Sequence, residues 1–171
     1  IEDERDEHGN EVEGSVYWVR VHDGRHAIEG KLYQPSGVGN KELIIFEPGL
    51  PGDGVIIFED RHAPNLLKEG YTVFAARHNG TVTNAVSSAK YIHASQKQEW
   101  SKQHHQQFLG EFTFEEWGTE VATAAKGLEA PFKKLHFMAH SMGAPNTLKA
   151  FTKLPPKLIQ KTSSFVSMSG A

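Results

Sequence analysis

The chain has 171 residues, of which 38% are hydrophobic and 23% are charged, and its formal net charge is −3. This length suits one domain with a core of useful size, and the weakly negative charge gives no indication of a nucleic-acid partner. The sequence contains no cysteine, which excludes disulfides and thiolate metal sites. No apolar run approaches the roughly 20 residues of a membrane-spanning helix.

The first 14 residues form an acidic segment. Its seven acids stand against the single base Arg5: Glu2, Asp3, Glu4, Asp6, Glu7, Glu11 and Glu13. Such segments are usually solvated, so we expect a mobile head over residues 1–14 and one folded domain over residues 15–171. The sequence starts with Ile1 rather than methionine, so we expect that it begins after processing or trimming. The sequence does not indicate whether the protein is cytoplasmic or secreted.

Three strands are predicted in the first third of the folded part. Residues 15–21 and 27–35 alternate apolar and polar side chains around an Asp23-Gly24 turn, which is typical of an antiparallel pair. Residues 42–46 are a short, nearly continuous apolar run, which favours a strand that is buried on both faces. A loop that contains Leu50 follows this third strand.

Helices and strands are then predicted to alternate. Residues 55–69 fit an amphipathic helix that Pro64 starts or kinks in its second half, and residues 71–76 fit another buried strand. Residues 82–113 are rich in glutamine, serine and histidine, and predict only a helix near residues 98–109. Adjacent histidines on a helix diverge by about 100°, so we expect no metal site there.

The second half is easier to interpret. Residues 114–128 predict a helix that Thr113 caps, with Glu116 completing a capping box. Its core-facing stripe has apolar residues three or four positions apart: Trp117, Val121, Ala124, Ala125 and Leu128. A strand at 135–139 and a helix that ends near Pro155 follow, and residues 163–168 predict one more strand.

The most informative motif joins that strand at 135–139 to the next helix. Ser141 stands at the tip of a strand–turn–helix segment, and such a turn forces the serine into an uncommon backbone conformation that exposes its hydroxyl. The residues two before and two after it must be small because the strand and helix backbones meet there. Ala139 and Gly143 satisfy this requirement.

The segment Ala139–Gly143 resembles the G-H-S-M-G nucleophile elbow of the α/β-hydrolase superfamily, with alanine in place of the first glycine. Residues 29–35 resemble the second strand of that superfamily. Residues 69–74 resemble its G-Y-x-V segment, and residues 77–80 resemble the D-x-R-G loop that follows it. The resemblance covers nearly the whole chain after Gly14. It implies an α/β fold with a mostly parallel sheet and helices on both faces, lacking the C-terminal strands of the family.

The same resemblance implies roles for individual residues. Ser141 is expected to be the nucleophile, and the backbone N–H groups of Leu50 and Met142 are expected to form the oxyanion hole. Ala139, His140 and Gly143 are expected to support the elbow. The implied reaction is hydrolysis of a small-molecule ester or related acyl substrate through an acyl-enzyme, with no cofactor and no metal.

The histidine and the acid that the family places after its serine are missing, because residues 142–171 contain no Asp, Glu or His. One interpretation is that a C-terminal companion part, in a second chain or in a longer protein, supplies them. Another is that an upstream histidine activates the serine, with His78 as the best candidate. A third is that the protein is a non-catalytic relative that only binds ligands.

Two alternatives for the function stay open within this scaffold. An acyltransferase or thioesterase would share the elbow and differ only in the acceptor. A non-catalytic binding module would leave Ser141 unused. The sequence does not define the acyl or alcohol preference, since the family builds much of its substrate pocket from insertions that would follow Ala171.

Overall fold

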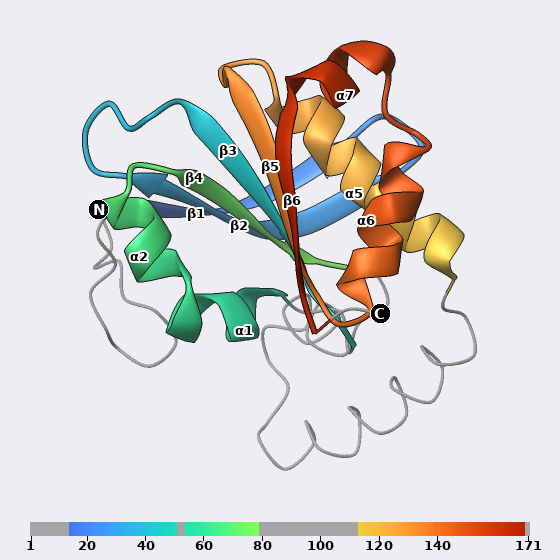
Figure 1. Ribbon diagram of the computed structural model, residues 1–171, viewed down its shortest axis with the longest axis horizontal. Coiled ribbons are helices and arrows are strands. Elements are labelled where there is room, and N and C mark those ends of the chain that lie inside the picture. The colour runs from blue at the N-terminus through green and yellow to red at the C-terminus, as the bar shows by residue number, and fades with distance from the viewer. Residues whose placement is uncertain (1–13, 51–53, 79–112, 170–171) are drawn as a thin grey trace.

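Figure 1 shows the computed structural model, which describes residues 14–50, 54–78 and 113–169. These residues form a six-stranded sheet in the order β1-β2-β4-β3-β5-β6. The strands are β1 (Gly14–His22), β2 (Ala27–Pro35), β3 (Glu42–Glu47), β4 (Thr72–Arg77), β5 (Lys134–His140) and β6 (Thr162–Met168). The β1–β2 and β2–β4 pairs are antiparallel, and the remaining pairs are parallel.

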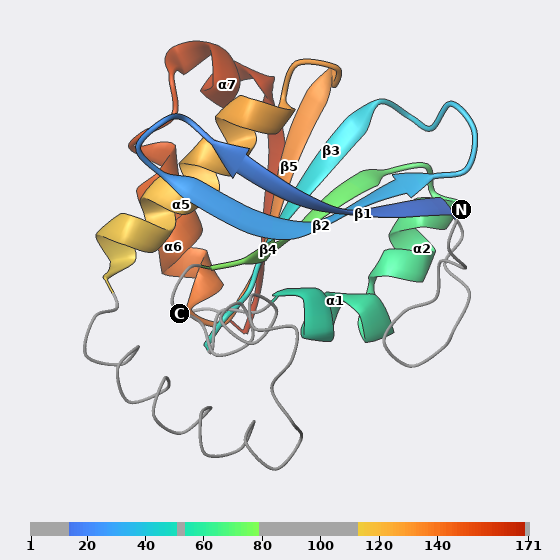
Figure 2. The ribbon, with the colours of Figure 1, turned by 180° about the vertical axis from the view of Figure 1, so that it is seen from behind.

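The described helices cover both faces of the sheet. They are α1 (Gly54–Arg61), α2 (Ala63–Lys68), α5 (Phe114–Leu128), α6 (Gly143–Phe151) and α7 (Pro156–Lys161). In Figure 1, α1 and α2 lie on one side of the strands and α5, α6 and α7 on the other. Figure 2 shows the same layers from behind, with β1 and β2 nearest the viewer. The predicted fold class, a mostly parallel sheet between helices, is confirmed.

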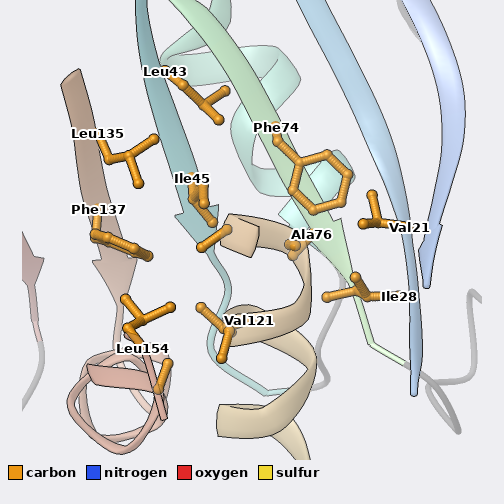
Figure 3. Packing of buried hydrophobic residues seen from close by; sticks show 14 of the residues in the cluster. Val21, Ile28, Leu43, Ile45, Phe74, Ala76, Val121, Leu135, Phe137 and Leu154 are labelled. Atoms are coloured by element: carbon orange, nitrogen blue, oxygen red, sulfur yellow. The ribbon is translucent and has the colours of Figure 1, made fainter. Parts of the chain in front are cut away.

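Two hydrophobic cores lie on the two faces of the sheet. Figure 3 shows the larger core, in which strand residues such as Phe137 pack against Val121 of α5 and Leu154 after α6. The smaller core joins the opposite face to residues of α1 and α2, including Phe58 and Leu67. All six residues of β3 are buried, which confirms the prediction of a strand enclosed on both faces.

Thr113 caps α5 as predicted, and the Glu116 carboxylate bonds back to the Thr113 hydroxyl. The Thr113 hydroxyl oxygen accepts a hydrogen bond from the Glu116 N–H at 3.1 Å, and the hydroxyl donates to Glu116 Oε2 at 3.0 Å. These bonds satisfy a donor at the first turn that the helix itself leaves without a partner.

Thr113→Ala is therefore expected to lower the free energy of unfolding by about 1 kcal/mol. Thr113→Ser keeps a hydroxyl at the cap and should cost much less. Urea unfolding of the two variants measures the difference, and equal losses would show that the cap does not stabilise the protein.

The segment predicted as one helix over residues 55–69 is two helices, with a break at His62. Pro64 lies in the first turn of α2, which confirms that it starts the second half. The short helix α7 was not predicted, because Pro155 and Pro156 were interpreted only as a stop. Proline is also favoured at the first position of a helix, where its missing N–H has no intrahelical partner to lose.

Several predictions lie outside the described residues. These are the acidic head over residues 1–13 and the helix near residues 98–109. Gly14, which was assigned to the head, is the first residue of β1. Among the helices that the structure describes, none has the length and apolar character needed to cross a membrane.

Candidate active site

Ser141 lies at a sharp turn between the end of β5 and the start of α6. Its φ angle is +52°, in the left-handed region that a residue with a side chain adopts only at an energetic cost. The Ser141 N–H donates to the carbonyl of Met168 at 2.9 Å, and the Ser141 carbonyl accepts from the Ala144 N–H at 3.1 Å. These bonds hold the turn between the end of β6 and the first turn of α6.

The small residues around the serine lie where strand and helix backbones approach. A Cβ added to Gly143 would lie 2.4 Å from the carbonyl oxygen of Glu47 and 2.7 Å from that of Pro48. Ala139 is fully buried and is paired in register with Glu47 on β3. Gly143 is therefore placed where a side chain would meet backbone oxygens, and Ala139 lies in the packed interior beside it.

Gly143→Ala is expected to destabilise the protein by about 1–3 kcal/mol or more, because the added methyl group would meet backbone oxygens that cannot rotate away. Thermal or urea unfolding measures the loss. If the variant were as stable as the wild type, the end of β3 would be able to move away from α6 at little energetic cost.

The loop after β3 rests on the serine. A Cβ added to Gly49 would lie 2.8 Å from Ser141 Cβ and 3.0 Å from the His140 carbonyl oxygen. Leu50 follows directly and is partly exposed. Met142 lies at the N-terminus of α6, where helix N–H groups lack intrahelical acceptors. The backbones of residues 49 and 142 thus adjoin Ser141 from the loop and from the helix.

His140 packs beside the elbow. Its ring is partly buried, and Nδ1 lies 3.3 Å from the position that a Cβ on Gly49 would take. This buried Nδ1 has no hydrogen-bond partner among the residues that the structure describes. Burial, and then the charges of Arg61 and His140, lower the pKa of His62. The predicted position of His140 next to the elbow is thus consistent with its contacts.

A buried ion cluster lies next to the elbow, and it was not predicted. Here the name denotes Glu47 at the end of β3, His78 after β4 and Glu120 on α5. His78 Nε2 donates to Glu47 Oε1 at 2.6 Å, and His78 Nδ1 donates to Glu120 Oε2 at 2.5 Å. The side chains of Glu47 and His78 are completely buried, so the cluster joins three elements deep in the protein.

Two further residues enclose the cluster. The Trp117 ring stacks on the His78 ring with centroids 4.0 Å apart and planes 5° from parallel. Asn146 of α6 is buried, and its Nδ2 donates to Glu47 Oε1 at 3.2 Å. Asn146 therefore connects α6, which follows Ser141, to Glu47, which precedes the loop at Gly49.

The charges of the cluster explain its pKa values. Burial disfavours the charged form of His78, but the charge of Glu47 and hydrogen bonds to both carboxylates outweigh it and raise the pKa of His78 to about 9. Burial raises the pKa of Glu47 above its usual range. His78 is therefore an imidazolium at neutral pH, with both ring nitrogens engaged. This geometry argues against the hypothesis that His78 is the base for Ser141.

The raised pKa of His78 predicts how stability depends on pH. A histidine with a pKa near 6.5 when unfolded and about 9 when folded stabilises the protein fully below pH 6.5. That stabilisation is lost as the pH rises through about 9. We expect the free energy of unfolding in urea to fall between pH 7 and pH 10. A constant value over this range would contradict an imidazolium at this position.

A weak signal for the cluster is present in the sequence. Glu120 interrupts the apolar, core-facing side of α5, between Trp117 and Val121. A charged residue on a buried helix face needs a partner, because burying an unpaired charge is very unfavourable. The sequence alone does not reveal which residue supplies that partner.

A serine–histidine–acid chain that does not include Ser141 lies near the starts of β3, β5 and β6. His136 Nε2 donates to Glu42 Oε2 at 2.9 Å, and Nδ1 lies 2.7 Å from the Ser164 hydroxyl oxygen. The hydrogen bond from His136 is the main cause that lowers the pKa of Glu42. Ser164 lies within β6 and has no left-handed backbone conformation. Both ring nitrogens of His136, in mid-strand and partly buried, therefore have a partner.

The described part of the chain contains no group of three or more His, Cys, Asp or Glu side chains arranged to hold a metal ion.

Comparison with known proteins identifies solved structures with a similar fold. No family model and no curated protein matches the sequence. Dienelactone hydrolase from Anabaena variabilis matches the structure with a TM-score of 0.61 and 15% identity over 92% of this chain and 64% of that chain. A dienelactone hydrolase-like promiscuous phosphotriesterase from metagenomic libraries matches with a TM-score of 0.56 and 18% identity over 91% of this chain and 59% of that one.

The acylaminoacyl peptidase of Pyrococcus horikoshii matches with a TM-score of 0.53 and 14% identity, over 91% of this chain and 23% of that chain. The chain thus spans about three fifths of the length of the two hydrolases above and less of the peptidase. Each of these structures covers more than nine tenths of this chain. The chain therefore has the α/β-hydrolase fold over most of its length.

Proposed function

We propose that the complete protein is a hydrolase of α/β type that cleaves an ester or related acyl substrate, with Ser141 as its nucleophile. The observation that carries this proposal is the left-handed conformation of Ser141 directly under the loop at Gly49. A strained serine at a strand-to-helix turn is the geometry that presents a nucleophilic hydroxyl.

The proposed chemistry has two stages. The Ser141 hydroxyl oxygen attacks the substrate carbonyl carbon, and the electron pair of the C=O bond moves onto the carbonyl oxygen. The N–H groups of Leu50 and Met142 would stabilise this oxyanion, and loss of one such donor typically lowers the rate by about 10²–10³-fold. The C=O bond re-forms, the ester C–O bond breaks, and the alcohol leaves with the proton that the base took from Ser141. Water then attacks the acyl-enzyme, the base takes its proton and returns it to Ser141 Oγ, and the acid is released.

The serine needs a proton acceptor, because its hydroxyl is a poor nucleophile until a base removes the proton. His78 does not suit this role, since both of its ring nitrogens donate to carboxylates. We propose that the activating histidine and its acid belong to a part of the complete protein beyond the described residues. The proposed source is a companion part C-terminal to this chain.

The matched structures support a hydrolase but do not select its substrate. Their names refer to a dienelactone, to phosphotriesters and to acylaminoacyl peptides. The elbow and the loop are suited to attack on an electrophilic centre bonded to oxygen. We therefore propose a small-molecule ester as the substrate class, with no cofactor.

A fluorophosphonate probe tests the proposal. The folded, complete protein should be labelled once, and prior unfolding should abolish labelling. Absence of labelling in a folded sample that includes the companion part would refute the serine mechanism and favour a binding module. Labelling combined with transfer of the acyl group to an added alcohol or thiol, in preference to water, would instead indicate an acyltransferase.

A further inference from the structure

The buried ion cluster reaches the candidate active site through Glu47. Its side chain accepts hydrogen bonds from His78 and Asn146, and its backbone carbonyl lies against Gly143. Two residues later, Gly49 rests on Ser141. The position of the loop over the serine is therefore linked, over two residues of chain, to the side-chain contacts of Glu47.

While both carboxyl groups are ionised, the two hydrogen bonds of the cluster require a protonated His78. An imidazolium has two N–H donors, and here one is directed at each carboxylate. A neutral imidazole keeps one N–H, so its other nitrogen would present a lone pair to a carboxylate. In a completely buried site this repulsion is not screened by water.

The described groups around the cluster include a neutral amide and an aromatic ring. Asn146 of α6 contributes one neutral N–H to Glu47 Oε1, while Glu47 Oε2 has no partner among the described residues. Trp117 of α5 contributes the face of its ring. Arg77 precedes His78 on β4, but its guanidinium lies over the ring of Trp18 at 4.4 Å. Among the described residues, the structure places the carboxylates of Glu47 and Glu120 against the two nitrogens of the His78 ring.

We propose that protonated His78 is a positioning residue for the proposed oxyanion hole, because it fixes Glu47 and thereby holds the Gly49–Leu50 backbone against Ser141. This inference rests on the proposed function, which it deepens by adding a control on the loop. His78 does not touch the substrate. It acts through Glu47, and its effect should be on the reaction rate rather than on substrate binding.

Two conservative variants of the complete protein test the inference. His78→Gln keeps a donor but has no charge, and should lower kcat for an ester about 10–100-fold with a smaller change in KM, because misplaced catalytic groups cost up to about 10²-fold. Wild-type kcat should fall as the pH rises through 9, and this fall should be absent in His78→Gln. Glu120→Gln removes one charge and should move the fall to lower pH by about one unit.

Val121→Ala is the matched structural control. Val121 neighbours Glu120 on α5, but it faces the larger core rather than His78. The variant should lose stability and keep both the kcat of the wild type and its fall near pH 9. A folded His78→Gln variant with wild-type kcat and an unchanged pH profile would overturn the inference.

A measurement without turnover separates this inference from the proposed function. The carbonyl ¹³C shifts of Glu47, Pro48 and Gly49 should change with pH in one step near pH 9 in the wild type and show no step in His78→Gln. If the step is present but the wild type hydrolyses no ester, the coupling stands and the proposed function fails. If these shifts show no such step in the wild type, the inference fails, whatever the activity.

Discussion

Ser141→Ala is expected to lower ester hydrolysis by the complete protein on the order of 10⁴–10⁶-fold, because removing the nucleophile of a serine hydrolase leaves only binding and oxyanion stabilisation. KM should change little, since the methyl group of alanine fits wherever the serine side chain does. Initial rates with an activated aryl ester measure the effect. A variant that retains one tenth of the wild-type rate would exclude Ser141 as the nucleophile.

Ser164→Ala is the matched control for this experiment. The Ser164 hydroxyl lies 2.7 Å from His136 Nδ1, and His136 is in turn bonded to Glu42. It therefore has an apparent base and acid, but it lies in a regular strand with no left-handed turn. We expect wild-type hydrolysis in this variant. If Ser164→Ala lost activity and Ser141→Ala kept it, Ser164 rather than Ser141 would be the nucleophile.

His78→Leu is expected to be the most destabilising of these substitutions, at about 3–5 kcal/mol in the free energy of unfolding. It leaves the carboxylates of Glu47 and Glu120 near each other in the interior with no cation between them. Urea unfolding at pH 7 measures the loss. The urea concentration at the midpoint of unfolding should fall, while the slope of the unfolding free energy against urea concentration should not change.

A triple variant separates charge from packing in that result. His78→Leu combined with Glu47→Gln and Glu120→Gln removes the imidazole and both negative charges together. Replacing a whole buried ionic group is often nearly neutral, whereas removing one partner is not. The triple variant should therefore recover much of the lost stability. If it is no more stable than His78→Leu, then lost packing against Trp117, and not the charges, explains the cost.

The sequence predicts the framework of this fold because its signals are local. The apolar run at 42–46 and the strand before Ser141 need only their own residues to be recognised. The same holds for the cap of α5, where Thr113 and Glu116 are three residues apart. The elbow follows from the small residues around Ser141, and its left-handed φ angle agrees with the strand–turn–helix prediction.

The buried ion cluster could not be predicted in the same way. His78 is 31 residues from Glu47 and 42 residues from Glu120 in the chain, so no local pattern joins them. Only the strand order, which places β4 next to β3 and brings α5 over the sheet, makes them neighbours. For this reason the sequence suggests His78 only as a candidate base for Ser141, whereas its contacts are those of a buried cation.

The most direct test of the central claim is a crystal structure of the complete protein after reaction with a phosphonate. We predict a covalent bond from phosphorus to Ser141 Oγ, with the phosphonyl oxygen about 2.7–3.1 Å from the backbone nitrogens of both Leu50 and Met142. An adduct on another residue, or a phosphonyl oxygen on Ser141 directed away from both amides, would contradict the account.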